Sequence, residues 1–103
     1  MKDCVIESSI KNGIATITVD GTFDIHVAQE FINQFKQLNE PASNLIVNLS
    51  NTQHIDSSAL GSIVKVRKLL GKDQPMRLSG AKGQVMKSLK TMRMHELCQV
   101  DGL

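Results

Sequence analysis

The sequence predicts a single α/β domain over residues 1–103, built on a mixed sheet that is at least partly parallel. Three observations support this class. The length suits one domain with one core. Strand and helix patterns alternate through most of the chain, which indicates βαβ crossovers and parallel pairing. An Asn-Gly pair between two β-branched runs indicates that the sheet opens with an antiparallel hairpin.

Strands are expected at residues 5–9 and 14–19, joined by the Asn-Gly turn at 12–13, where both residues favour the positive φ of a type I′ turn. Asp-Gly at 20–21 is expected to end the second strand. A helix is predicted over residues 25–39, with Asp24 as a plausible N-cap. Its apolar residues recur every three or four positions and so share one face: Ala28, Phe31, Ile32, Phe35 and Leu38.

The second half continues the alternation. Pro41 lies in a loop at residues 40–44 that stops the first helix. The apolar run 45–49 predicts a strand covered on both faces, followed by a short connection at 50–55. A helix is expected over 57–70 with Leu60, Ile63, Val64 and Val66 inward, ending at Gly71. The pattern then predicts a strand at 76–79, a turn at 80–83, a helix ending near His95 and a short strand at 97–100. The last helix is expected to bury Val85, Met86, Leu89 and Met92.

Composition restricts the function classes. Aromatic residues make up only 3% of the chain, which argues against modules that stack nucleic-acid bases on aromatic rings. No apolar run approaches the roughly 20 residues that span a bilayer, and no signal-peptide pattern opens the chain, so we expect a cytoplasmic protein without direct membrane insertion. Cys4 and Cys98 form no close-spaced motif and are interpreted as reduced, semi-buried thiols.

Charge is distributed unevenly along the chain. Residues 1–56 contain three basic and seven acidic side chains, whereas residues 57–103 contain nine basic and three acidic ones. Solvated outer faces of helices are the simpler explanation. The alternative is a basic surface that attracts an acidic partner.

The stretch from Ile55 to Gly61 is the main candidate site. It joins the buried strand to the helix that begins near Ser57, and a helix start presents backbone N–H groups and favours negative charge. A serine there can act as the N-cap or carry a phosphate.

The residues around Ser57 also allow two other kinds of site. His54, Asp56 and Ser57 permit a Ser-His-Asp arrangement, but the Gly-x-Ser-x-Gly of a nucleophile elbow is missing. A metal site formed by His54, Asp56 and Asp24 is disfavoured because His-x-Asp is common in loops. We therefore predict no enzyme activity, no cofactor and no metal.

Four segments together resemble the STAS domain family, and within it the small stand-alone anti-sigma factor antagonists. Residues 21–24, Gly-Thr-Phe-Asp, resemble the family's Gly-x-hydrophobic-Asp element, and residues 45–50 resemble its central strand. Residues 55–61, Ile-Asp-Ser-Ser-Ala-Leu-Gly, are similar to its Asp-Ser-Ser-Gly-Leu-Gly signature. Residues 83–97 fit its last helix. The resemblance implies a STAS fold, a mixed sheet of roughly four to five strands with about three to four helices packed mainly on one side.

The resemblance also implies a bacterial, phosphorylation-controlled partner switch in transcription regulation. In such proteins a GHKL-type serine kinase, often itself the anti-sigma factor, phosphorylates the first serine after the aspartate, and a PP2C-like phosphatase removes the phosphate. The unphosphorylated form binds the kinase or another regulatory target protein, and the phosphorylated form releases it. By the motif the acceptor here is Ser57, with Ser58 as second choice. The expected partner-binding residues are Asp24, His26, His54, Asp56, Ser57, Ser58 and Gly61.

Two departures and one alternative accompany this interpretation. Ala59 occupies a position where the family commonly has Gly, and Asn48 one where many members have an acidic residue. The alternative function is a non-switching STAS subunit of a membrane transport or multi-protein stress or signalling complex, with the same fold but no phosphate cycle.

Overall fold

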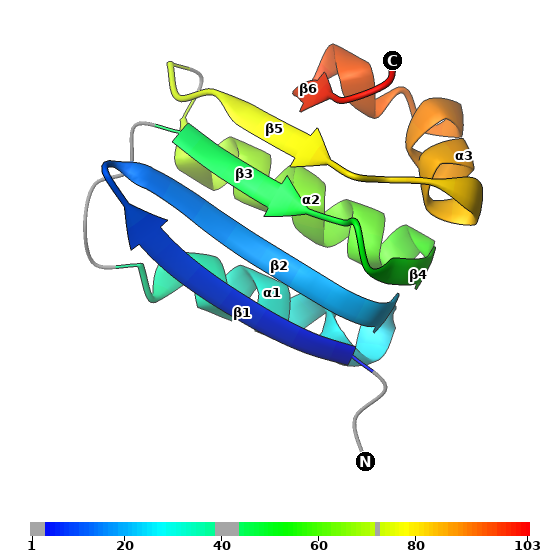
Figure 1. Cartoon of the computed structure of the whole chain (residues 1–103), viewed down its shortest axis with the longest axis horizontal. Coiled ribbons are helices and arrows are strands. Elements are labelled where there is room, and N and C mark those ends of the chain that lie inside the picture. Colours follow the sequence, from blue (N-terminus) through cyan, green and yellow to red (C-terminus); the bar gives the residue numbers. More distant parts are fainter. Residues whose placement is uncertain (1–3, 39–43, 72) are drawn as a thin grey trace.

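A six-stranded mixed sheet with helices on one of its faces forms the frame of the protein (Figure 1). The computed structural model describes residues 4–38, 44–71 and 73–103. The elements are β1 (Cys4–Lys11), β2 (Ile14–Phe23), α1 (Ile25–Lys36), β3 (Asn44–Asn48), β4 (Thr52–Ile55), α2 (Ser57–Leu70), β5 (Met76–Ser79), α3 (Gly83–Thr91), the 3-10 helix η1 (Met94–Glu96) and β6 (Gln99–Val100).

The strand order confirms the predicted α/β class. The strands are arranged β1-β2-β3-β5-β6, and β4 pairs with the C-terminal end of β2. Among the described strands, β1 and β2 pair antiparallel and all the other pairs are parallel. The hairpin turn has the expected geometry, with φ of 55° at Asn12 and 81° at Gly13. The short strand expected near the C-terminus is β6, parallel to β5.

Two expectations near the site were wrong, and together they explain why the sheet has six strands. Strand β2 does not end at Asp20-Gly21 but continues to Phe23. Gly21 adopts a φ of 119°, and a register shift after it absorbs the irregularity without ending the pairing. The predicted connection at 50–55 contains β4. Its Thr52 hydroxyl donates a buried hydrogen bond of 2.6 Å to the Val19 carbonyl oxygen, which ties this short polar strand to β2.

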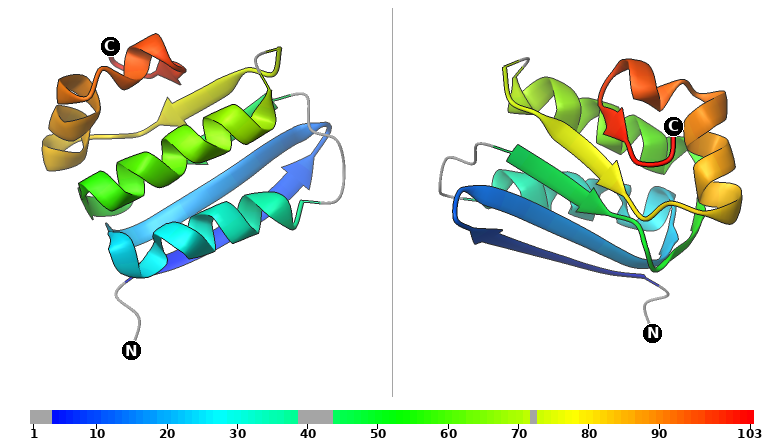
Figure 2. Two further views of the ribbon diagram at one scale, coloured as in Figure 1. Left: turned by 180° about the vertical axis from the view of Figure 1, so that it is seen from behind. Right: turned by 45° about the horizontal axis from the view of Figure 1, so that its top comes forward.

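The core lies between the sheet and the helices α1 and α2, which cross the back of the sheet side by side (Figure 2). Phe23 of β2 and Phe31 of α1 are both fully buried, with ring centroids 5.1 Å apart.

Helix α1 ends at Lys36, earlier than predicted, because Gln37 forms its C-cap. The predicted loop at 40–44 lies outside the described residues except for Asn44, which begins β3.

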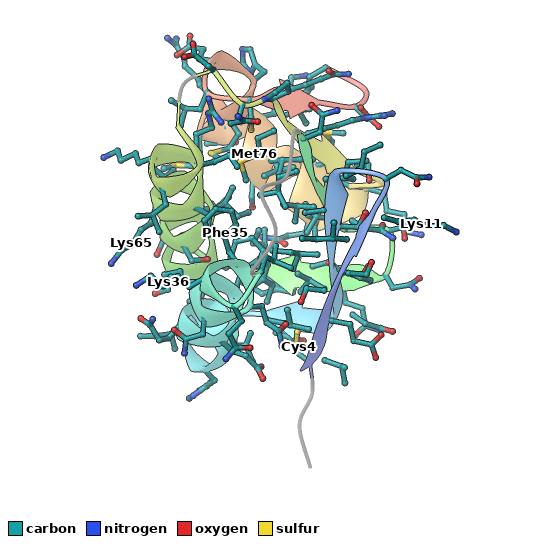
Figure 3. The ribbon with its side chains drawn as sticks, turned by 90° about the vertical axis from the view of Figure 1, so that its left-hand side faces the viewer. Cys4, Lys11, Phe35, Lys36, Lys65 and Met76 are labelled. Atoms are coloured by element: carbon teal, nitrogen blue, oxygen red, sulfur yellow. The ribbon has the colours of Figure 1, made fainter. Side chains whose placement is uncertain are left out.

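No helix of the described residues lies on the opposite face of the sheet (Figure 2). In Figure 3, Lys11 lies on that side, whereas Lys36 and Lys65 extend from the helical layer and Phe35 points between helices and sheet. Arg77 of β5 and Asp101, the residue after β6, form an ion pair of 2.8 Å. The prediction that helices pack mainly on one side is therefore confirmed.

The apolar stripe of α3 differs from the prediction at one position. Val85 and Leu89 are fully buried, but Met92 is 56% exposed. The helix ends at Thr91 and the chain turns at Arg93, which has a left-handed φ of 55°. This turn changes which residues face the core, so Met94 is buried there in place of Met92.

Both cysteines are free thiols, and Cys4 is almost completely buried while Cys98 is partly buried. Burial raises the pKa of the Cys4 thiol from 9.0 to about 11, and the carboxylates of Asp24, Glu30 and Asp20 add to this rise.

The raised pKa predicts a specific loss of stability in alkali. The unfolded chain releases the Cys4 proton near pH 9, but the folded chain keeps it until about pH 11. The stabilising contribution is therefore complete below pH 9 and is lost as the pH rises through that interval. Measured by urea unfolding, the total fall in the free energy of unfolding across this pH interval is expected to be larger by about 3 kcal/mol in wild type than in Cys4→Ala. Parallel pH curves for the two proteins would contradict this.

Candidate functional site

Two parallel strands end side by side, and each leads through an aspartate into a helix. Phe23 at the end of β2 is the register partner of Ile55 at the end of β4. The backbone N–H of Asp56 donates to the Phe23 carbonyl oxygen at 3.2 Å, which continues the pairing by one residue. The starts of α1 and α2 therefore lie at the same rim of the sheet, near the β4 label in Figure 1.

The aspartates stabilise both helix starts, and Asp56 connects them. Asp24 is the N-cap of α1 and its carboxylate accepts from the His26 backbone N–H at 2.9 Å, which confirms the predicted cap. Asp56 is the N-cap of α2: Oδ1 accepts from the Ala59 N–H at 2.9 Å, and Oδ2 accepts from the Ile25 N–H at 3.2 Å. One carboxylate thus satisfies N–H groups at the starts of two helices.

The possibility that Ser57 acts as the N-cap is therefore wrong. Ser57 is the first residue inside α2, one position after the cap, and its side chain is exposed. Within the described part of the chain its hydroxyl has no hydrogen-bond partner. Ser58, the second-choice acceptor, is half-buried in the same turn. The hydroxyl of Ser57 is thus available to another molecule.

The remaining candidate residues lie on the elements that start or end at this rim. His26 is exposed in the first turn of α1, and His54 is exposed on β4, opposite Thr22 in the register. Gly61 lies one turn after Ser57 on the same face of α2. Apart from its chain neighbours and the adjoining backbone of α2, no heavy atom of the described residues lies within 4 Å of the position that a side-chain carbon would occupy there. Packing inside the protein therefore does not require glycine at position 61.

A hollow that the sequence did not indicate lies beside Ser57, between the start of α2 and α3. Its volume is about 420 Å³, and its lining includes Ser57 and Leu60 on one side and Gln84, Lys87, Thr91 and Met92 on the other. The apolar pattern predicted Met92 in the core, and no motif marked Gln84 or Lys87. Only the packing of α3 beside β4 brings these residues next to Ser57.

Gln84 holds α3 against this rim. Its side-chain Oε1 accepts from the Ile55 N–H at 3.0 Å, and its Nε2 donates to the Ile55 carbonyl oxygen at 2.9 Å. The amide thus pairs with the exposed edge of β4 much as a neighbouring strand would. The distance between α3 and the start of α2 is consequently set within the free protein.

The geometry does not assemble the catalytic arrangements considered above. Both Asp56 oxygens accept from backbone N–H groups, and among the described residues no hydrogen bond joins His54 to Asp56 or to Ser57 as a triad requires. Across residues 4–38, 44–71 and 73–103, no three His, Cys, Asp or Glu side chains gather closely enough to hold a metal ion.

Comparison with known proteins identifies the family. The sequence matches the STAS domain family over residues 5–101, and the chain belongs to that family. No curated protein matches the sequence.

Solved structures share the fold at low sequence identity. An anti-sigma factor antagonist from Mycobacterium paratuberculosis is 16% identical with a TM-score of 0.85, covering 97% of this chain and 86% of that one. A sulfate transporter family protein from Wolinella succinogenes is 17% identical with a TM-score of 0.76, covering 89% and 79%. The Bacillus anti-sigma factor antagonist SpoIIAA is 13% identical to this chain. Its unphosphorylated form has a TM-score of 0.73, and the match covers 96% of this chain and 89% of that one. Its phosphorylated form has a TM-score of 0.72, and the match covers 93% of this chain and 90% of that one.

The two departures from the family pattern are accommodated locally. The side-chain oxygen of Asn48 accepts from the Ser50 N–H at 3.0 Å, a bond that a carboxylate oxygen could equally accept. Ala59 is fully buried inside α2 and donates its N–H to the Asp56 cap.

None of the helices in the described part of the chain has the length and apolar character needed to span a membrane.

The double role of Asp56 predicts unequal effects of removing the two caps. We expect Asp56→Ala to lower the free energy of unfolding by about 2 kcal/mol and Asp24→Ala by about 1 kcal/mol, because only Asp56 also accepts from the other helix. Asp56→Asn should lie between wild type and Asp56→Ala, since one oxygen remains to cap α2. Urea denaturation measures all three. Equal losses for Asp56→Ala and Asp24→Ala would show that the bond to Ile25 contributes nothing.

The open surroundings of Gly61 predict that Gly61→Ala stabilises the isolated protein. Alanine is favoured over glycine in a helix interior by about 1 kcal/mol, and it meets no neighbouring atom here. Thermal unfolding should shift upward by roughly 4–8 °C. A lower melting temperature would mean that the helix surface at position 61 is not open.

Proposed function

We propose that this protein is a phosphorylation-controlled partner-switching regulator of the anti-sigma factor antagonist type. In its unphosphorylated form it binds a partner protein at the rim around Ser57, and phosphorylation of Ser57 releases that partner. The observation that supports this best is the exposed Ser57 hydroxyl, which Asp56 leaves unused by taking over the N-cap.

The local electrostatics favour a switch that does not unfold the protein. A phosphate adds about −1.5 to −2 charges and strong acceptor oxygens. At the start of α2 the helix dipole stabilises that charge by about 0.3–1 kcal/mol, while the adjacent Asp56 carboxylate opposes it. Because these effects nearly cancel, the folded state is expected to survive modification.

The larger effect falls on a protein pressed against the rim. Burying an unpaired phosphate in an interface costs several kcal/mol, and about 4 kcal/mol already corresponds to a thousandfold change in affinity. A switch of that size needs no large change of shape. The solved structures of SpoIIAA in both phosphorylation states have nearly equal similarity to this fold, which supports the proposal.

The proposed partners are a GHKL-type serine kinase that is itself the anti-sigma factor, a PP2C-like phosphatase, and alternatively another regulatory target. The proposed role is binding rather than catalysis. Ser57 is preferred over Ser58 because it is exposed where Ser58 is half-buried. Asp24, His26, His54 and Gly61 lie on the elements that start or end at the rim around Ser57, and we propose that they contact the bound partner.

Substitutions at Ser57 test the proposal. We expect Ser57→Ala to retain the partner constitutively in affinity co-purification, and Ser57→Asp to lose at least tenfold of it because a negative charge enters the interface. Ser9→Asp is the matched control, since Ser9 is an exposed serine on the helix-free face of the sheet. Equal binding by Ser57→Ala, Ser57→Asp and wild type would overturn the switch at this residue.

Intact mass of the native protein, before and after phosphatase treatment, separates the two candidate functions. Loss of one phosphate from wild type but not from Ser57→Ala supports the switch. The alternative is a non-switching STAS subunit of a transport or signalling complex, and it is favoured by the similarity to the Wolinella sulfate transporter family protein. That alternative predicts an unmodified protein that co-purifies with a membrane complex.

A further inference from the structure

The surface of α3 beside Ser57 has a single sign of charge. Residues 74–95 contain five basic side chains and no acidic one. Lys82, Lys87 and Lys90 are all exposed along α3. Arg93 approaches Glu96 only at 3.8 Å, and both side chains are more than half exposed, so this pair neutralises little of the charge.

The hollow at the foot of this basic surface is mostly apolar. The nearly fully buried side chains of Ile55 and Leu60 line it, and Met92 stands beside it with 56% of its surface exposed. Lys87 lines the same hollow and connects it to the basic surface. At about 420 Å³ it has room for a leucine or phenylalanine side chain.

We infer that this hollow receives an apolar side chain from an acidic segment of a partner protein, and that Lys87 and Lys90 attract the carboxylates of that segment. An exposed methionine at the edge of an apolar hollow is suited to cover an inserted side chain. In the described part of the chain neither Lys87 nor Lys90 forms an ion pair. Asp56 lines the same hollow as Lys87, but its carboxylate accepts from the Ala59 and Ile25 N–H groups, so the lysines favour a negatively charged partner. The helix-free face of the sheet offers no such preference, because Glu7, Lys11, Asp20 and Arg77 mix both signs there.

The hollow is formed before the partner arrives. The two hydrogen bonds between the Gln84 amide and the Ile55 backbone, at 3.0 and 2.9 Å, hold α3 at its distance from the start of α2. Association therefore does not need to order this surface first.

This inference deepens the proposed function and rests on it in one respect, the direction of the switch. Ser57 lines the same hollow as Lys87. A phosphate on Ser57 would repel an acidic segment and would compete with that segment for Lys87. Phosphorylation would then release the partner by changing the charge of its binding groove.

A peptide titration tests the surface without the natural partner. The probe is a synthetic peptide of about a dozen residues, rich in Glu and Asp with one central Leu, added to the full-length ¹⁵N-labelled protein. We expect saturable amide shifts at residues 55–60 and 84–92, with the Leu→Ser peptide binding at least tenfold more weakly. Saturable shifts confined to other surfaces, or none up to about 1 mM peptide, would overturn the inference.

Matched variants separate the contribution of the lysine charges from that of the apolar contact with Met92. Lys87→Glu combined with Lys90→Glu should weaken peptide binding at least tenfold, whereas Lys65→Glu, which changes an exposed lysine of α2 outside the hollow, should not. Met92→Ser should weaken binding of the Leu peptide, whereas Leu69→Ser, at a 48% exposed position elsewhere on α2, should not. If the control variants have the same effect as the hollow variants, the peptide is not bound in the hollow.

Ser57→Asp separates this inference from the switch. If the peptide binds wild type at the hollow and Ser57→Asp equally well, the docking surface stands and the release mechanism fails. If Ser57→Asp weakens the peptide at least tenfold, both stand. If the peptide does not bind the hollow of wild type but Ser57→Ala and Ser57→Asp still differ in co-purification, the switch stands and this docking surface fails.

Discussion

The two hydrogen bonds that the Asp56 carboxylate accepts hold together the rim where α1 and α2 begin. One comes from the start of α2 and the other from the start of α1, so the two helices that cover the sheet meet at one residue. This arrangement exists because β2 and β4 run parallel and end in register at Phe23 and Ile55. A parallel pair brings both helix starts to the same edge, where their dipoles would otherwise face solvent with unpaired N–H groups.

The same interaction explains why Ser57 is chemically free. A serine at a helix start usually serves as the cap, and its hydroxyl is then engaged with backbone N–H groups. Here the preceding aspartate performs that role, so the cap that stabilises the helix and the serine that we propose as the phosphorylation site are adjacent residues. A modification at Ser57 can therefore alter the charge of the surface without removing a bond that holds the fold together.

The second half of the chain supplies a different surface beside that residue. Gln84 attaches α3 to the edge of β4, and the attachment brings Lys87 and Met92 next to Ser57. The excess of basic residues after position 56 first allowed two interpretations, solvated helix faces or a surface for an acidic partner. Lys82, Lys87 and Lys90 lie at the start of α3 or along it, and Lys87 lines the apolar hollow, which is why we infer the second interpretation for Lys87 and Lys90.

Local sequence patterns determined the α/β class, the helix over 57–70, the Asp24 cap, the Asn-Gly hairpin and the resemblance to the STAS family, because each depends on residues close together in the chain. Tertiary structure alone decided the rest. β4 is short and polar, and only its pairing with β2 and the Thr52 hydrogen bond make it a strand. Met92 fits the apolar period of α3, but the left-handed turn at Arg93 buries Met94 in its place. Whether Asp56 or Ser57 caps α2 depends on backbone direction at the end of β4, and the hollow joins residues some thirty positions apart, which no local pattern can specify.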